Sequence, residues 1–139
     1  MDRAGIPHLT VTELAKLIET KQVSPVEAVE AYLDRIEQVD GKLNSYITVC
    51  KEEALAAARQ AEADISAGQY KGPMHGIPVA VKDQFNTQGI RTTNGSNVHR
   101  DFIPDHDATV VANLKQAGAV LLGKLNMSEF ASGDAFHHP

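Results

Sequence analysis

The first half of the chain repeats apolar residues at the three- and four-residue spacing of amphipathic helices. Three segments have this spacing, and they predict helices over residues 12–20, 25–38 and 51–67. The pairs Thr10 with Glu13 and Ser24 with Glu27 have capping-box spacing and mark the starts of the first two helices. Gly41 is a stop signal for the second helix. Between the second and third helices, the β-branched and aromatic stretch 45–49 predicts a short strand.

A different pattern begins near residue 72. Residues 77–81 form an apolar run without alternation, which is typical of a strand covered on both faces. After a long loop rich in Gly, Asn and Thr, Asp107 is expected to cap a further helix, and a second apolar run follows at 119–123. The order strand, helix, strand predicts a parallel pair with a right-handed crossover.

These elements predict an α/β protein in which a helical lead-in precedes a sheet. We expect residues 1–71 to form the lead-in, and residues 72–139 to form the first part of an α/β core. A chain of 139 residues suits one small domain or a piece of a larger one, and 42% hydrophobic residues are enough to build a core.

Composition narrows the classes of function. Thirteen basic against eighteen acidic residues give a formal net charge of -5, which argues against a nucleic-acid-binding face. The single cysteine, Cys50, cannot form an internal disulfide, so a reducing, cytoplasmic setting is expected, with Cys50 as a small buried or surface thiol. No apolar run approaches the roughly 20 residues that span a membrane.

Lys82 is the main candidate for chemistry. It ends the apolar run of "HGIPVAVKDQFNT", and ligands of open α/β sheets gather at the carboxyl ends of parallel strands. Burial there favours the neutral amine, which can act as a general base. The alternative is structural: a lysine that extends from the strand end into solvent, or one that pairs with Asp83.

Other polar residues have two interpretations each. His106 lies between two aspartates, but the spacing matches no known ligand pattern, and capping by Asp107 explains the segment better. His137 and His138 suit a polar loop more than a metal site. The stretch "TTNGSN", residues 92–97, could bind an anion through backbone amides or could simply form turns.

Several motifs together resemble one family. "SPVEAVEAYLDRIEQVDGKLNSYITV", "GIPVAVKD", "GIRTTNGS" and "DFIPDHDATVVANLKQAGAVLLGKLNMSEFASG" occur in the order and at the spacing of the amidase signature enzymes. The resemblance runs from about Leu9 to the end of the chain. It implies a mixed α/β core around a large sheet, hydrolysis of carboxylic amides, and no cofactor. The helical lead-in also resembles the glutamine-hydrolysing component of the tRNA-dependent amidotransferases.

The resemblance assigns Lys82 to a Ser–cis-Ser–Lys triad. In that family the lysine takes a proton from a serine with a cis peptide bond, which in turn takes one from the nucleophilic serine. The family's two serines lie in and just after a "GGSSGG"-type segment that also supplies the oxyanion hole. No such run occurs among these 139 residues. The chain is therefore expected to hold the base alone, as the N-terminal portion of an amidase, and to be inactive by itself.

The stretch "NMSEFASG" is similar to the family loop that lines the acyl side of the substrate pocket. By this resemblance Ala131 and Ser132 would lie nearest the substrate, while Met127 and Phe130 could simply pack into the core. Asn126 and Glu129 have capping-box spacing for a short helix there.

Three functions remain open from the sequence: an amidase, the glutamine-hydrolysing component of an amidotransferase, and a non-catalytic remnant or binding module. The expected partner is a small amide substrate, with partner subunits only in the second case and neither nucleic acid nor membrane. The predicted strand edges and apolar faces, if left uncovered, would make the isolated chain marginally stable and prone to associate.

Overall fold

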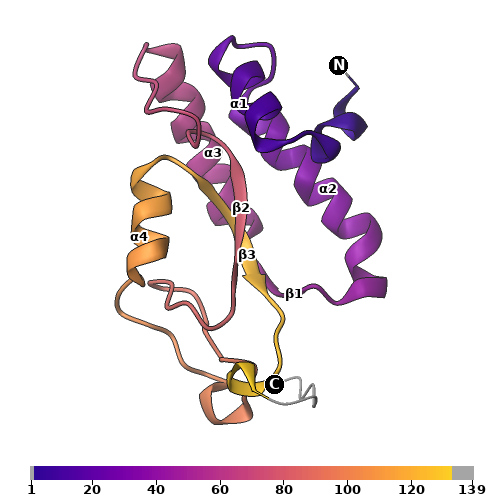
Figure 1. The fold of residues 1–139 in the computed structure, drawn as a ribbon, viewed down its shortest axis with the longest axis vertical. Coiled ribbons are helices and arrows are strands. Elements are labelled where there is room, and N and C mark those ends of the chain that lie inside the picture. Colours follow the sequence, from indigo (N-terminus) through magenta and orange to yellow (C-terminus); the bar gives the residue numbers. More distant parts are fainter. Residues whose placement is uncertain (1, 133–139) are drawn as a thin grey trace.

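The computed structural model describes residues 2–132 (Figure 1). Its α-helices are α1 (Val11–Glu19), α2 (Pro25–Leu43), α3 (Lys51–Ser66) and α4 (Thr109–Gln116). Short 3-10 helices are η1 (Arg3–His8), η2 (Asn97–His99) and η3 (Glu129–Ala131). The strands are β1 (Tyr46–Val49), β2 (Pro78–Lys82) and β3 (Val120–Leu125). The order of these elements confirms the predicted α/β class with helices ahead of the sheet.

The strands form a mixed three-stranded sheet in the order β1-β3-β2. β2 runs parallel to β3, as predicted from the two apolar runs, and β1 pairs with β3 in the antiparallel direction. The register places Lys82 beside Leu125, so both parallel strands end at the same edge of the sheet. Figure 1 shows the loops that follow β2 and β3 gathered at this end, away from α1.

β2 is less covered than its unbroken apolar run predicts. It lies at the edge of the described sheet, and Pro78, Val79 and Ala80 are only half-buried. Val79 packs against one apolar cluster, but no second layer encloses the strand within residues 2–132. The prediction of a strand covered on both faces is therefore wrong for this part of the chain.

Two apolar clusters hold the helices against the sheet. The first joins α1 and the start of α2 to Ile77, and includes Leu14 and Ile18, each 1% exposed. The second packs α2 and α3 against one face of β3 through Val120 and Leu122. The apolar faces expected of the three helices are thus the ones that the structure buries.

Both predicted capping boxes form. Thr10 Oγ1 accepts the Glu13 amide at 3.2 Å, and Ser24 Oγ accepts the Glu27 amide at 3.1 Å. Each glutamate in turn accepts the backbone amide of its capping partner at 2.8 Å. Two donors at each helix start are therefore satisfied locally.

The expected stop at Gly41 is wrong, because α2 continues through it to Leu43. Asn44 ends the helix in a left-handed conformation, with φ 52°, and donates its amide to Asp40 O at 2.7 Å. Asparagine is the residue other than glycine that commonly takes this position. The side chain of Asp40 then accepts the amide of Ser45 at 2.8 Å.

Two further cap predictions also fail. α4 begins after Ala108 without a side-chain cap, because Asp107 instead accepts the Gln88 amide and pairs with Lys115 Nζ at 2.8 Å. The predicted box of Asn126 and Glu129 does not form, and only the three-residue η3 follows β3. In both cases the acidic side chain reaches a partner distant in sequence rather than its own helix start.

Candidate active site

Lys82 is the last residue of β2 and lies half-buried at the carboxyl edge of the sheet. Two backbone contacts fix the chain around it: Asp83 N donates to Leu125 O at 3.0 Å, and Phe85 N donates to Lys82 O at 3.0 Å. Within residues 2–132 its ammonium makes no ion pair or hydrogen bond. Lys82 ends an edge strand of the described sheet, although a central strand was expected from the sequence.

Asp83 does not pair with Lys82, so that structural alternative is wrong. The carboxylate of Asp83 is fully buried, and its Oδ2 accepts both the amide of Thr93 at 2.9 Å and the hydroxyl of Thr93 at 2.5 Å. Asn94 N also donates to the Asp83 carbonyl at 3.1 Å. The loop after β2 therefore folds back onto the residue that follows Lys82.

The segment 92–96 is a turn whose amides are already occupied. Thr92 N donates to Phe102 O, Gly95 N to the Thr93 hydroxyl, and Ser96 N to Thr93 O. The turn interpretation of this stretch is thus confirmed. The anion that its amides bind is the chain's own Asp83 carboxylate.

Lys124 completes this network and was not singled out in the sequence. It lies in β3 with 0% exposure, and its Nζ donates to Thr92 Oγ1 at 2.6 Å and to Phe85 O at 3.0 Å. The same Nζ lies 3.2 Å from Asp83 Oδ1, which accepts no hydrogen bond from any described residue. The ammonium charge is therefore the main compensation for this carboxylate oxygen.

Burial and pairing act in opposite directions on Lys124. Burial lowers the pKa of its ammonium and is the larger influence, whereas the Asp83 carboxylate raises that pKa. One signal in the sequence could have identified the pair. A lysine interrupts the apolar run "VLLGKL", and an acidic residue directly follows the parallel neighbour.

The expected substrate-facing residues Ala131 and Ser132 are exposed, just after β3. Phe130 and Ala131 both have left-handed backbones, with φ 47° and 57°, an arrangement that costs energy for residues other than glycine. Phe130 N donates to Asn94 O at 2.8 Å, and Asn94 N donates to Asp83 O. Through the backbone of Asn94, the segment 130–132 is thus joined to the end of β2.

Packing separates the two apolar residues of this segment. Met127 is buried, at 4% exposure, as the packing interpretation predicted. Phe130 is 51% exposed, so that interpretation is wrong for its ring, which makes an edge contact with His99 at a centroid distance of 5.7 Å. Ser96 donates to Glu129 Oε1 at 2.5 Å and ties the segment to the turn 92–96.

The remaining candidates lie away from this edge. His106 contacts Asp105 at 2.7 Å and Asn86 at 3.1 Å on the surface. Among residues 2–132, no three His, Cys, Asp or Glu side chains are grouped as metal ligands. Cys50 is buried just before α3, and burial raises the pKa of its thiol. His137 and His138 lie outside the described residues.

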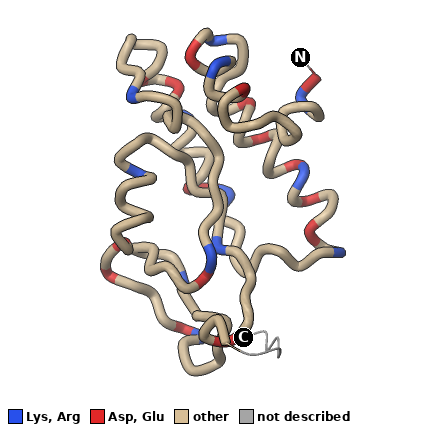
Figure 2. The backbone as a smooth tube through the Cα atoms, in the orientation of Figure 1, with Lys and Arg blue, Asp and Glu red and all other residues tan. Residues whose placement is uncertain are grey.

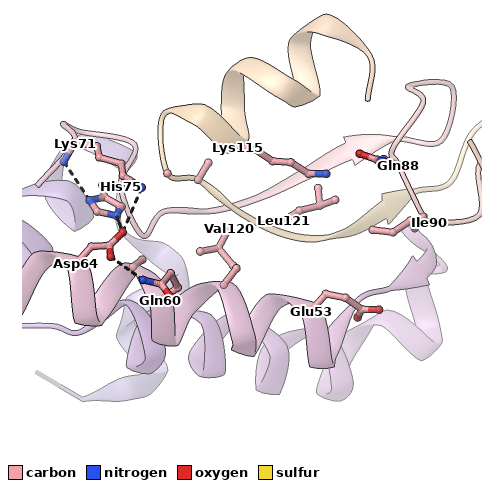
Figure 3. Close-up of a pocket in the computed structure, with 15 residues that line it drawn as sticks. Glu53, Gln60, Asp64, Lys71, His75, Gln88, Ile90, Lys115, Val120 and Leu121 are labelled. Atoms are coloured by element: carbon pink, nitrogen blue, oxygen red, sulfur yellow. Dashed lines mark hydrogen bonds and ion pairs between the residues drawn. The ribbon is translucent and has the colours of Figure 1, made fainter. Parts of the chain in front are cut away.

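A cavity of about 500 Å³ lies on a different part of the fold, between α3 and α4 (Figure 3). Neither Lys82 nor Ala131 nor Ser132 lines it. The polar residues at one end are mutually engaged: Asp64 binds Gln60 and Lys71, and His75 accepts the Lys71 amide at 3.1 Å (Figure 3). The cavity therefore does not contribute to the site at the strand ends.

Charges of both signs are interspersed along the backbone, without one sign dominating an element (Figure 2). No helix among the described residues combines the length and apolar character needed to cross a bilayer.

The Amidase family profile matches residues 27–139 of the chain. The chain is 51% identical, over 127 residues, to a glutamyl-tRNA(Gln) amidotransferase component, its A-type subunit, from Geobacter sp. (strain M21), covering 91% of this chain and 26% of that protein. It is 50% identical, over 131 residues, to the putative amidase AmiD of Mycobacterium tuberculosis (strain ATCC 25618 / H37Rv), with coverage of 94% and 28%.

Solved structures agree with these similarities. The native peptide amidase from Stenotrophomonas maltophilia superimposes with a TM-score of 0.82 at 35% identity, covering 86% of this chain and 25% of that one. An amidase family protein from Bacillus anthracis str. Ames superimposes with a TM-score of 0.85 at 37% identity, covering 99% and 28%. The chain thus spans about a quarter of the length of its relatives, and it belongs to the amidase family.

Proposed function

We propose that this chain supplies the base of an amidase site, and that Lys82 is that base. The observation that carries the proposal is the state of its side chain. Lys82 stands at the carboxyl end of β2, half-buried and without a partner among residues 2–132. The neighbouring lysine of β3 is fully enclosed and paired. Of these two amines at the edge of the described sheet, only the Lys82 amine is free to exchange a proton with an incoming hydroxyl.

The reaction proposed is hydrolysis of a carboxylic amide by a Ser–cis-Ser–Lys triad. Neutral Lys82 accepts a proton from one serine, which accepts the proton of the nucleophilic serine as that oxygen attacks the amide carbonyl. The matching serine motif is absent from these 139 residues. We therefore expect Lys82 to act together with sequence equivalent to the rest of the longer relatives, and the chain alone to be inactive.

The segment 130–132 is proposed to line the substrate side of this site. Its left-handed backbone and its link through Asn94 to the end of β2 support the assignment of Ala131 and Ser132. Strained backbone of this kind is frequent at ligand-binding positions.

A second candidate is the glutamine-hydrolysing component of a tRNA-dependent amidotransferase. The 51% identity to the Geobacter amidotransferase component favours it, while the 50% identity to the putative amidase favours a free-standing hydrolase. In the first case the substrate would be glutamine and other subunits would be partners. In the second it would be another small amide.

The isolated chain tests the first part of the proposal. Purified protein is incubated with glutamine, aliphatic amides and amidated peptides, and released ammonia is measured. No turnover is expected, because nucleophile and oxyanion hole are lacking. Turnover that disappears in Lys82→Ala would overturn the proposal that this chain holds the base alone.

A chimera tests the base itself. The chain replaces the matching quarter of the Stenotrophomonas peptide amidase, and circular dichroism establishes that the product is folded. We expect activity in the chimera and a loss of at least about a thousandfold in kcat for Lys82→Ala, as for other triad members. Lys42→Ala, at an exposed position near the end of α2, is the control and should retain activity. Equal activity in both variants would contradict the assignment.

A further inference from the structure

The structure points to a second functional lysine, and we propose that Lys124 is a positioning residue. Its ion pair with Asp83 holds the end of β2 and the turn 92–96 in place, and thereby sets the position of Lys82 and of the segment 130–132. The inference rests on the proposed function of Lys82.

Lys124 is the largest fully buried side chain of the described residues, and its position is an expensive one for a charge. Desolvating an ammonium and a carboxylate costs several kcal/mol each by general estimates, and apolar side chains of similar volume often replace such pairs without loss of stability. Packing alone therefore does not account for a lysine among the apolar residues of β3. A requirement for one defined geometry does account for it.

Three contacts of Lys124 match the three donors of an ammonium group. They reach Phe85 O, Thr92 Oγ1 and Asp83 Oδ1, at 3.0, 2.6 and 3.2 Å. These oxygen atoms lie at the two ends of the loop that follows β2. One side chain of β3 therefore closes that loop and fixes both of its ends against the neighbouring strand.

The loop passes this constraint on to the residues of the proposed site. Asp83 directly follows Lys82 and anchors the turn by accepting from Thr93 and Asn94. Asn94 O then accepts the amide of Phe130. A continuous path of contacts thus leads from Lys124 to both candidate parts of the site, the base and the substrate-facing segment.

Lys124 is unsuited to be the base itself. It is inaccessible to solvent, and its ammonium faces three oxygen atoms within the chain. A substrate hydroxyl could reach it only if the loop opened. Its contribution is therefore exerted through the placement of Lys82.

The test uses a small change, because removing the cation leaves Asp83 buried without a counter-charge and threatens the fold. Thr92→Val removes one acceptor of Lys124 and preserves side-chain shape, and Thr92→Ser restores the acceptor. Thr109→Val, at an exposed position in α4, is the matched control. The 139-residue chain is examined by amide hydrogen exchange and by the NMR signal of the lysine Cε groups, with Lys82 assigned from Lys82→Arg.

In Thr92→Val we expect exchange at Thr93 and Asn94 to accelerate about tenfold or more, while amides of α2 stay within about twofold. The Lys82 signal should shift in Thr92→Val and return in Thr92→Ser. Uniform acceleration across α2 and the turn, or an unmoved Lys82 signal, would overturn the inference, because each is what a purely structural role predicts.

The chimera adds a kinetic measurement. Thr92→Val should lower kcat more than it raises KM, because the base is misplaced while the substrate is still bound. If Lys82→Ala leaves the chimera active, the proposed function fails, yet hydrogen exchange and the Lys82 signal in the isolated chain still decide whether Lys124 positions Lys82. If Lys82→Ala inactivates the chimera and Thr92→Val changes neither kcat nor exchange, only the present inference fails.

Discussion

The helical layer and the carboxyl edge of the sheet are stabilised by different kinds of interaction. In the helical layer, α1 and α2 meet through apolar side chains such as Leu14 and Ile18, and their starts are capped by adjacent residues. At the sheet edge, the fully buried residues include Asp83, Thr92, Thr93 and Lys124. An apolar layer tolerates changes of shape at moderate cost, whereas a buried polar network depends on every partner. The region proposed for chemistry is therefore the less tolerant of the two.

The largest expected effect breaks the polar network. Lys124→Met leaves Asp83 buried without its counter-charge and should lower the free energy of unfolding by about 3–5 kcal/mol, measured by urea titration. Lys115→Met removes a partly exposed pair with Asp107 and should cost about 0–1 kcal/mol. Similar losses in the two variants would remove the distinction between the regions.

A cavity in the helical layer should have a somewhat smaller effect. Ile18→Ala deletes buried methyl groups from the first cluster and should cost about 3 kcal/mol in the same titration. Val11→Ala changes a side chain of the same helix that is 52% exposed, and it should cost no more than about 0.5 kcal/mol. The comparison also requires that Ile18→Ala leave hydrogen exchange in the turn 92–96 no faster than global unfolding demands.

Loss of a cap measures the local contribution to the helical layer. Ser24→Ala removes the acceptor for the Glu27 amide and should lower the free energy of unfolding by about 1 kcal/mol. Ser24→Asp keeps an acceptor at the helix start and should restore most of it. An effect as large as that of Ile18→Ala would show that capping rather than packing dominates this layer.

The smallest expected effect is a pH dependence where α3 meets the start of β2. Burial first, and Lys71 second, lower the pKa of His75, while Asp64 opposes them. The unfolded chain therefore binds a proton that the folded chain does not, once the pH falls below about 6.5. The free energy of unfolding should decrease from that pH downward until the folded histidine also titrates.

His75→Asn keeps an acceptor for the Lys71 amide and removes the titration. Between about pH 7.5 and pH 5, a range that brackets the ordinary histidine pKa, its free energy of unfolding should vary less than that of the unsubstituted chain. An identical slope for the two proteins would assign the pH dependence to other groups.

The sequence by itself determined the parts of this protein that depend on neighbouring residues. Helical periodicity and capping boxes located α1, α2 and α3, because the interactions that define them span three or four residues. The two apolar runs and the helix between them determined the parallel pair of β2 and β3. The family and the position of Lys82 were recoverable for a similar reason, since both rest on short motifs.

Only the tertiary structure decided which polar residues meet. Lys124 finds Thr92 from 32 positions away, and Asp107 turns from its own helix to Gln88 and Lys115. Local spacing carries no information on such contacts, because they depend on the strand register and on the path of the loop between the strands. The partner of Asp83 was decided in the same way. Lys82 is adjacent in sequence, but the buried Lys124 lies on the neighbouring strand, where it compensates the carboxylate charge out of contact with water.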